Sequence, residues 1–97
     1  MTEEESKALN ESIRLNERLN ALKNNEDFKE IILKRFIDDG IKGNMMALPF
    51  AATDDSKKRH YANLEAIARL QGYFLAIERN AESAKQALQD DVEIVEE

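Results

Sequence analysis

The stretch that decides the fold covers residues 67–88 and reads IARLQGYFLAIERNAESAKQAL. Its apolar residues recur in alternating steps of three and four, the a/d spacing of a helix or coiled coil that buries one stripe against other helices. This seam consists of Ile67, Leu70, Phe74, Ile77, Ala81, Ala84 and Leu88. The helical pattern around it extends from about residue 56 to about residue 90. The sequence therefore predicts an all-α fold, a helical hairpin or small bundle with one long C-terminal helix, and the seam predicts a homo-oligomer.

The composition fits one helical domain over residues 1–97. Charged residues make up 35% of the chain, which has three glycines, one proline and no cysteine. The lack of cysteine excludes disulfides and thiolate zinc sites. No apolar run approaches the roughly 20 residues of a membrane-spanning helix, and the N-terminal residues are acidic where a signal peptide is basic. We therefore expect no membrane partner and a protein that is intracellular when made.

The net charge of −6 is concentrated at the two ends of the chain. Three glutamates lie within residues 1–5 and five acidic residues within residues 85–97, whereas the body between them has a net charge of +1. Acidic ends keep a chain soluble, and they are also typical of a docking peptide for a basic partner or of a nucleic-acid mimic.

Three shorter helices are predicted before the long one. The first covers about residues 4–23, and its narrow apolar stripe consists of Ala8, Leu15, Leu19 and Leu22. The second covers about residues 26–38, with an apolar face formed by Phe28, Ile31, Ile32 and Phe36 and widened by Leu33 and Ile37. Asn24 and Asn25 supply N-cap residues for its start, and Asp39-Gly40 is predicted as its C-cap. A third, over residues 45–48, stops before Pro49. Thr53 caps the long helix, and residues 91–97 form an acidic tail.

The irregular segment Met45–Ala52 carries eight residues that are apolar or proline and includes Met45, Met46 and Phe50. In a soluble chain such a run is expected to be buried, either against the protein's own core or against a partner. One interpretation is a loop that closes the end of its own core, because Pro49 would let the Phe50 ring turn back across the Phe28–Phe36 face. The other is a subunit or partner interface, because Met and Phe are favoured at adaptable contact surfaces.

No residue set predicts catalysis, a cofactor or a metal. The only histidine, His60, has Lys57 and Asn63 three positions away on either side, so the Glu-x-x-His pattern of a di-metal bundle is missing. Paired aspartates occur only at predicted helix ends, where they act as caps and turn residues. No glycine-rich phosphate loop follows a strand. We expect no enzymatic activity, no cofactor and no metal.

The best candidate for phosphate contact is the run from Lys57 through Lys58, Arg59 and His60 to Tyr61. Cationic groups beside an aromatic ring can bind phosphates and stack a base. Two aspartates precede the run directly, and the acidic chain as a whole repels polyanions. A solvated first helical turn, or salt bridges at an interface, are therefore favoured over nucleic-acid binding.

Two stretches together carry a resemblance. Residues 19–36 read LNALKNNEDFKEIILKRF, and residues 64–88 read LEAIARLQGYFLAIERNAESAKQAL. They resemble a group of small, acidic, helical accessory proteins of tailed bacteriophages, encoded near head and packaging genes. The resemblance implies a non-enzymatic protein-protein interaction protein that is associated with the virion or acts in its assembly. Such a protein would be made in the host cytoplasm, and a virion-associated one would then be incorporated into the virion. Its partner would be a phage structural protein.

Two alternatives remain open. One is a phage regulator or inhibitor that binds a host protein through its acidic ends. The other is a nucleic-acid-binding packaging accessory that uses Lys57, Lys58 and Arg59.

Replacing Lys57, Lys58 and Arg59 together with glutamine tests the basic run. If these residues only solvate the helix start, thermal unfolding should be unchanged or slightly raised, because three cations near a helix N-terminus oppose its dipole. Salt-sensitive DNA binding by the parent protein that disappears in the triple variant would contradict this interpretation. Fluorescence anisotropy with labelled duplex DNA at two salt concentrations measures this DNA binding for the parent and the triple variant.

Overall fold

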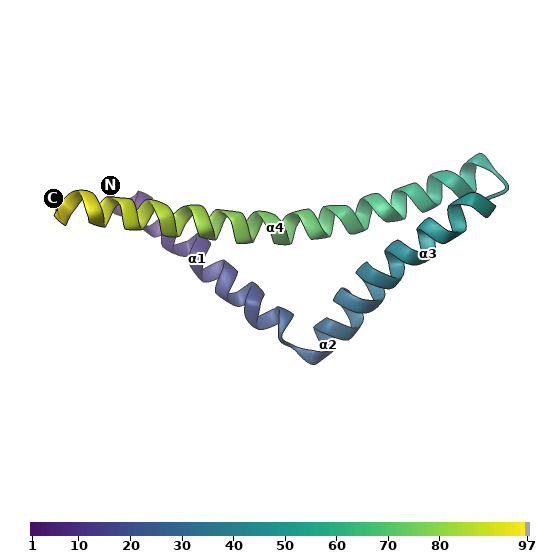
Figure 1. The fold of residues 1–97 in the computed structure, drawn as a ribbon, viewed down its shortest axis with the longest axis horizontal. Helices are drawn as coiled ribbons and strands as arrows, with labels where there is room; N and C mark the ends of the chain where they lie inside the picture. The colour runs from purple at the N-terminus through teal and green to yellow at the C-terminus, as the bar shows by residue number, and fades with distance from the viewer. Residues whose placement is uncertain (97) are drawn as a thin grey trace. The chain divides into compact units, whose positions relative to one another are not determined.

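The computed structural model describes residues 1–96, and their side chains as far as Asp91. Its elements are α1 (Glu3–Lys23), α2 (Glu26–Phe28), the π-helix η1 (Lys29–Asp39), α3 (Gly40–Ala47), the 3₁₀ turn η2 (Leu48–Phe50) and α4 (Asp54–Glu96). The all-α class and the long C-terminal helix are confirmed, and the described residues contain no strand (Figure 1). Within residues 1–96, no helix combines the length and apolarity that a membrane crossing requires.

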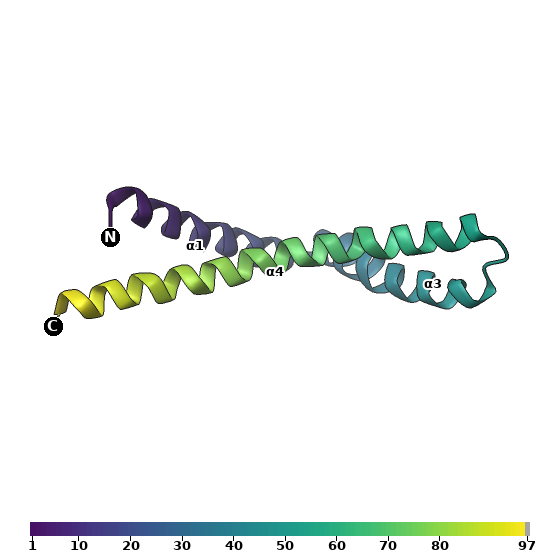
Figure 2. The same ribbon diagram turned by 90° about the horizontal axis from the view of Figure 1, so that it is seen from above.

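Contacts divide the chain into two compact units. The terminal unit joins Met1–Leu22 to Tyr73–Glu97, and the central unit covers Lys23–Gly72. Within the terminal unit, α1 lies antiparallel to the last part of α4 (Figures 1 and 2), and the Met1 amino group lies 3.8 Å from the Asp91 carboxylate. Within the central unit, α2, η1 and α3 run antiparallel to the first part of α4. The central unit is therefore a helical hairpin, and the terminal unit is an antiparallel pair of helical segments that come from the two ends of the chain.

Two predicted helix starts are confirmed by their capping bonds. The Asn25 side-chain oxygen accepts a hydrogen bond of 3.0 Å from the Phe28 backbone N–H, and Asn25 itself is extended. The Thr53 hydroxyl oxygen accepts one of 3.1 Å from the Ser56 backbone N–H. Each bond satisfies a backbone donor that the first helical turn leaves without a partner. At the other end, α4 continues to Glu96, so the backbone of the expected tail is helical that far; the side chains of residues 92–97 lie outside the described part.

The predicted break at Asp39-Gly40 is wrong. Gly40 has helical dihedral angles, φ −62° and ψ −44°, so η1 passes directly into α3 and the separate helix expected over residues 45–48 is part of one continuous segment. The reason for a glycine here is packing. A Cβ atom at Gly40 would lie 2.8 Å from Cδ1 of Ile67 in α4, which is only 3% exposed. Gly40 thus permits a close approach of two helices.

The π-helix changes which side chains of the second predicted helix face inward. Ile37, which the sequence placed at the widened edge of the apolar face, is buried as expected, whereas Ile31 and Phe36, which the sequence placed at its centre, are exposed. A π-helix closes its hydrogen bonds over five residues instead of four, so its inner face advances by longer steps than the α-helical period used for the prediction. Phe28, Ile32 and Ile37 follow this wider spacing and are half-buried or buried.

The predicted stripe of α1 is also wrong in register. Leu19 is buried as expected, but Ala8, Leu15 and Leu22 are exposed. The inner face is shifted by about one residue and contains Leu9, Ser12, Ile13, Asn16 and Leu19. Apolar residues occur on both of these faces of α1, so the spacing of apolar residues alone does not predict which face is buried. The chosen face includes Asn16, whose buried Oδ1 has no hydrogen-bond partner among the described residues, a cost of about 1–3 kcal/mol.

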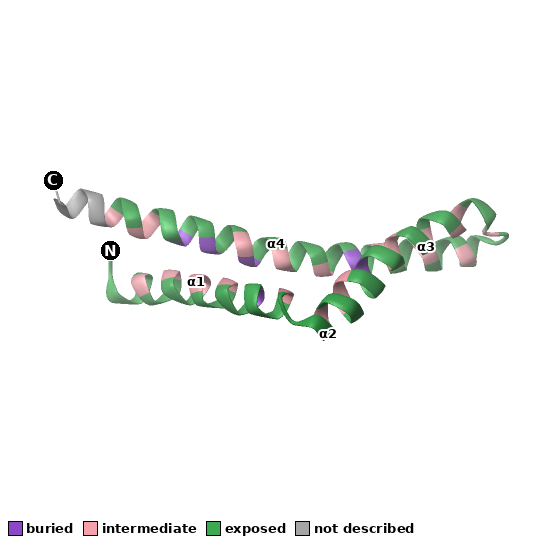
Figure 3. Cartoon of the chain, turned by 60° about the horizontal axis from the view of Figure 1, so that its bottom comes forward, coloured by how far each residue is buried: buried purple, intermediate pink, exposed green. Residues whose placement is uncertain are grey.

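The core is thin in both units, as Figure 3 shows. The buried apolar side chains are Leu19, Ile77, Ala81 and Ala84 in the terminal unit and Ile37 and Ile67 in the central unit. Four of these six belong to the predicted seam, and its other three members are half-buried. The seam is therefore the inner face of α4.

Alanine substitutions at two helical glycines should have different effects on the free energy of unfolding. Gly43→Ala meets no atom within 4 Å and should stabilise the protein by about 1 kcal/mol through helix propensity. Gly40→Ala should give no such gain, because its methyl group must displace Ile67, and overpacking costs about 1–3 kcal/mol. Urea unfolding followed by circular dichroism measures both. Equal stabilisation by the two changes would contradict the close approach.

Candidate protein-interaction surface

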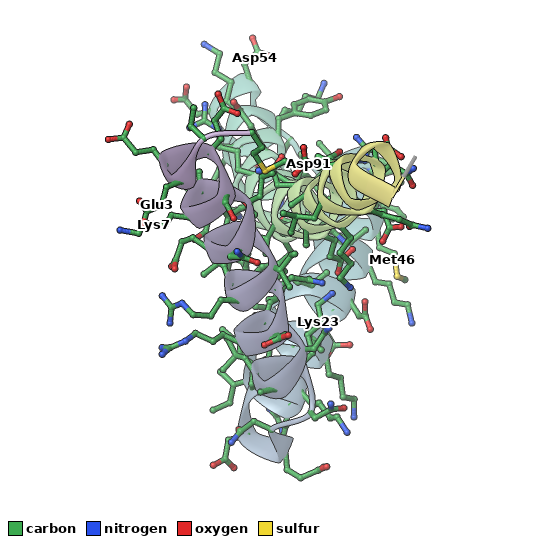
Figure 4. All side chains as sticks on the ribbon, turned by 90° about the vertical axis from the view of Figure 1, so that its left-hand side faces the viewer. Glu3, Lys7, Lys23, Met46, Asp54 and Asp91 are labelled. Carbon is green, nitrogen blue, oxygen red and sulfur yellow. The ribbon has the colours of Figure 1, made fainter. Side chains whose placement is uncertain are left out.

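Five exposed residues form one face of α3 and η2. Lys42, Met45, Met46, Pro49 and Phe50 have the spacing i, i+3, i+4, i+7, i+8, which places side chains on one side of a helix. The exposed fractions are 59% for Met45, 72% for Met46 and 86% for Phe50. We name these five residues the tip face. Met46 projects from it into solvent (Figure 4).

A polar cluster on the opposite side of α3 holds this helix against α4. The Asn44 side-chain oxygen lies 2.8 Å from Nδ1 of His60 and accepts a second hydrogen bond, 3.1 Å long, from Nδ2 of Asn63. Asn44 Nδ2 donates to the Gly40 carbonyl oxygen over 2.7 Å. Because Asn44 accepts at that oxygen, His60 carries a proton on Nδ1. Asn44 and Gly40 therefore face α4, and the tip face is left on the outer side.

The prediction that Phe50 packs back across the Phe28–Phe36 face is wrong. Phe50 is the most exposed of the large apolar side chains in the described part of the chain. Pro49 lies in the first turn of η2, which continues the direction of α3 and does not reverse it. The Phe50 ring consequently stays on the outer side, together with Met45 and Met46.

The basic run at the start of α4 is split by the structure. Lys57, Lys58, Arg59 and Tyr61 are exposed, whereas His60 is half-buried and bonded to Asn44. His60 is thus a packing residue of the central unit. Sequence reasoning missed this role; the spacing of His60 and Asn63 on one helical face was the available signal, but nothing in the sequence indicates Asn44 as their partner.

A second apolar feature lies in the terminal unit, between α1 and α4. It is a groove of about 160 Å³ lined by Leu15, Arg18, Leu19, Leu22, Tyr73, Phe74 and Ile77. Leu15, Leu22 and Tyr73 are exposed and form its rim, whereas Leu19 and Ile77 are buried and form its floor. Of the seam residues predicted at an interface, Phe74 and Ile77 line this groove. We name it the terminal groove.

Arg14 and Glu11 form an ion pair on the surface of α1. Arg14 donates hydrogen bonds to both Glu11 carboxylate oxygens, and these bonds lower the pKa of Glu11 and raise that of Arg14. Both side chains are exposed, so solvent screens the pair and it contributes little to stability. Among the described residues, no group of three histidine or acidic side chains is placed to hold a metal ion.

The substitution Phe50→Ala should leave the stability of the isolated protein almost unchanged. An exposed ring buries little surface in the folded chain, so we expect a change below about 0.5 kcal/mol in the free energy of unfolding. Ile37→Ala is the control in the same unit and should cost about 2–5 kcal/mol, because Ile37 is buried. Urea unfolding of the two variants compares them. A decrease of about 3 kcal/mol in the free energy of unfolding for Phe50→Ala would contradict this expectation and indicate that the ring packs in the core.

Similarity to known proteins does not assign a function to this surface. No protein-family model, no curated protein and no solved structure matches the chain. Two interpretations therefore remain predictions from the sequence. One is the interface role of the seam and of Met45, Met46 and Phe50, and the other is the phage setting.

Proposed function

We propose that this chain is a non-enzymatic protein-protein interaction protein and that its tip face contacts the partner. The observation that carries the proposal is the exposure of Met45, Met46 and Phe50 on one helical face. Exposed apolar patches on soluble proteins mark interaction sites. Methionine adapts its shape to a partner, and aromatic residues and methionine are enriched where proteins meet.

The internal packing of the central unit supports this proposal. Among its described side chains, Ile37 and Ile67 are buried, while six large apolar side chains are exposed: Ile31, Phe36, Met45, Met46, Phe50 and Tyr61. Three of the six, Met45, Met46 and Phe50, lie together on the tip face. A partner that covered this face would gain the free energy of apolar burial, about 1.5–3 kcal/mol for each fully buried side chain.

The resemblance of residues 19–36 and 64–88 gives the proposal a setting. We propose a tailed phage as the source and the virion, or its assembly, as the place of action, with a phage structural protein or a second copy as the partner. Mass spectrometry of purified particles separates a virion component from a regulator of a host protein, because only the former remains with the particle.

Site-specific photo-crosslinking tests the role of the tip face. A photoreactive phenylalanine analogue at position 50 should give a protein adduct in cells that produce the chain, because the ring is expected to lie inside a contact. The same analogue at position 68 is the control, since Ala68 is exposed on α4 outside the tip face. Equal yields at both positions, or no adduct at position 50, would overturn the proposal. Mass spectrometry of the adduct identifies the partner.

A further inference from the structure

The π-helix η1 is unusually long. π-Helical geometry occurs mostly as a single wide turn inside an α-helix, frequently at functional sites, whereas η1 keeps it over 11 residues, Lys29–Asp39. The segment follows α2 directly and passes without a break into α3, so both of its ends join α-helix. An α-helical form of the same residues is therefore the nearest alternative to the observed one.

The two forms differ in how far they turn the chain about the helix axis. An α-helix turns by about 100° per residue. A π-helix, whose hydrogen bonds span five residues, turns by only about 80° per residue. Over the 11 residues of η1 the difference adds up to roughly half a turn. The form of η1 therefore decides which side of α3 faces α4.

The sequence after Phe28 shows which residues the α-helical form would place on the inner face. Phe28 is half-buried, and the Asn25 cap fixes the start of the helix beside it. Met46 follows Phe28 by 18 residues, which is about five turns of an α-helix, and Phe50 follows about one turn later. A continuous α-helix from Phe28 would thus turn Met46 and Phe50 towards α4 and Asn44 away from it.

A choice between two ion pairs accompanies the choice of form. Glu30 is followed by Lys34 after four residues and by Arg35 after five, and all three side chains are exposed. A separation of four residues brings Glu and Lys together on an α-helix, whereas a separation of five fits the wider turn of a π-helix. In the structure Glu30 pairs with Arg35, with 3.2 Å between Oε1 and Nη2. The observed pair favours the π form, and Lys34 offers the competing α-helical pair.

We propose that η1 is a conformational switch that controls the exposure of the tip face. In the π form, which the structure shows, Gly40 and Asn44 face α4 and the tip face lies on the outer side. In the α form, α3 rotates by roughly half a turn, and Met46 and Phe50 pack against α4. The switch itself can be observed without a partner, whereas its role as a control of binding rests on the proposed function.

The two forms exchange one set of contacts for another. Rotation out of the π form breaks the hydrogen bonds of Asn44 to α4, removes Ile37 from the core and turns the charged Arg35 towards α4. In return it buries Met46 and Phe50, which are 72% and 86% exposed in the structure. These costs make the π form the major state, and the opposing gain gives the α form a minor population of about 0.1–10%. A partner that binds only the exposed tip face shifts the equilibrium further towards the π form.

Two matched variants should shift this equilibrium in opposite directions. Arg35→Ala removes the ion pair of the π form, and also the charge that the α form turns towards α4, so it should favour the α form. Lys34→Ala removes the ion pair of the α form and leaves that of the π form. Both variants replace an exposed cation of η1 with alanine, so they change the net charge and the helix propensity of the segment alike.

A deletion of both Lys34 and Arg35 makes the π form unnecessary. Two residues of α-helix turn the chain by about 200°, which is close to the angle by which the two forms differ. With these residues removed, an α-helical η1 can keep Phe28 and Asn44 on the same inner face. The tip face of the deletion variant should therefore stay on the outer side without a second state.

NMR of the methionine methyl groups measures the populations. Of the three methionines, Met45 and Met46 belong to the tip face, whereas Met1 belongs to the terminal unit and serves as the control. Carbon-13 saturation-transfer experiments detect minor states that exchange within milliseconds. Met46 should show such a state in the parent protein. Its population should be roughly twofold higher in Arg35→Ala and roughly twofold lower in Lys34→Ala, as expected for one helical ion pair. Met1 should show none.

Three results would overturn the switch. The absence of a minor state at Met46 in Arg35→Ala would exclude the α form. Equal populations in the two alanine variants would show that the exchange is not a change of helical register. A minor state that persists in the deletion variant would indicate local unfolding of the central unit. Circular dichroism verifies that the variants fold, and the two alanine variants decide alone if the deletion variant does not. None of these results changes the outcome of the photo-crosslinking test of the proposed function.

Discussion

The close approach between Gly40 and Ile67 is the contact on which the arrangement of the central unit depends. Because Gly40 has no side chain, the backbone of the η1–α3 segment comes near enough to α4 to cover Ile67. The same approach brings Asn44 within hydrogen-bond distance of His60 and Asn63. Steric fit and hydrogen bonding thus set the rotation of α3 about its axis. That rotation places Met45, Met46 and Phe50 on the outer side.

A consequence of this construction is that the chain buries few side chains for its length. Each unit consists of two antiparallel layers of helix, and two helices can cover only one stripe of each other. The small residues Ala81 and Ala84 bring little apolar area to the terminal unit, and the buried Asn16 oxygen weakens it further. Stability gained through association would compensate for so small a core, because a partner that binds only the folded state stabilises it by mass action.

Local pattern was sufficient to predict the helical class, the seam of α4 and the caps at Asn25 and Thr53, because period and capping chemistry act within a few residues. It was insufficient wherever a distant residue chooses among local options. Ile67 makes Gly40 a packing position and not a helix end, and α4 selects one of two apolar registers in α1. The wide turns of η1 expose Ile31 and Phe36, which an α-helical period places on the inner face. Phe50 could be recognised from the sequence as a candidate contact residue, but its exposure depends on the side of α3 that Asn44 holds against α4, and no local pattern contains that information.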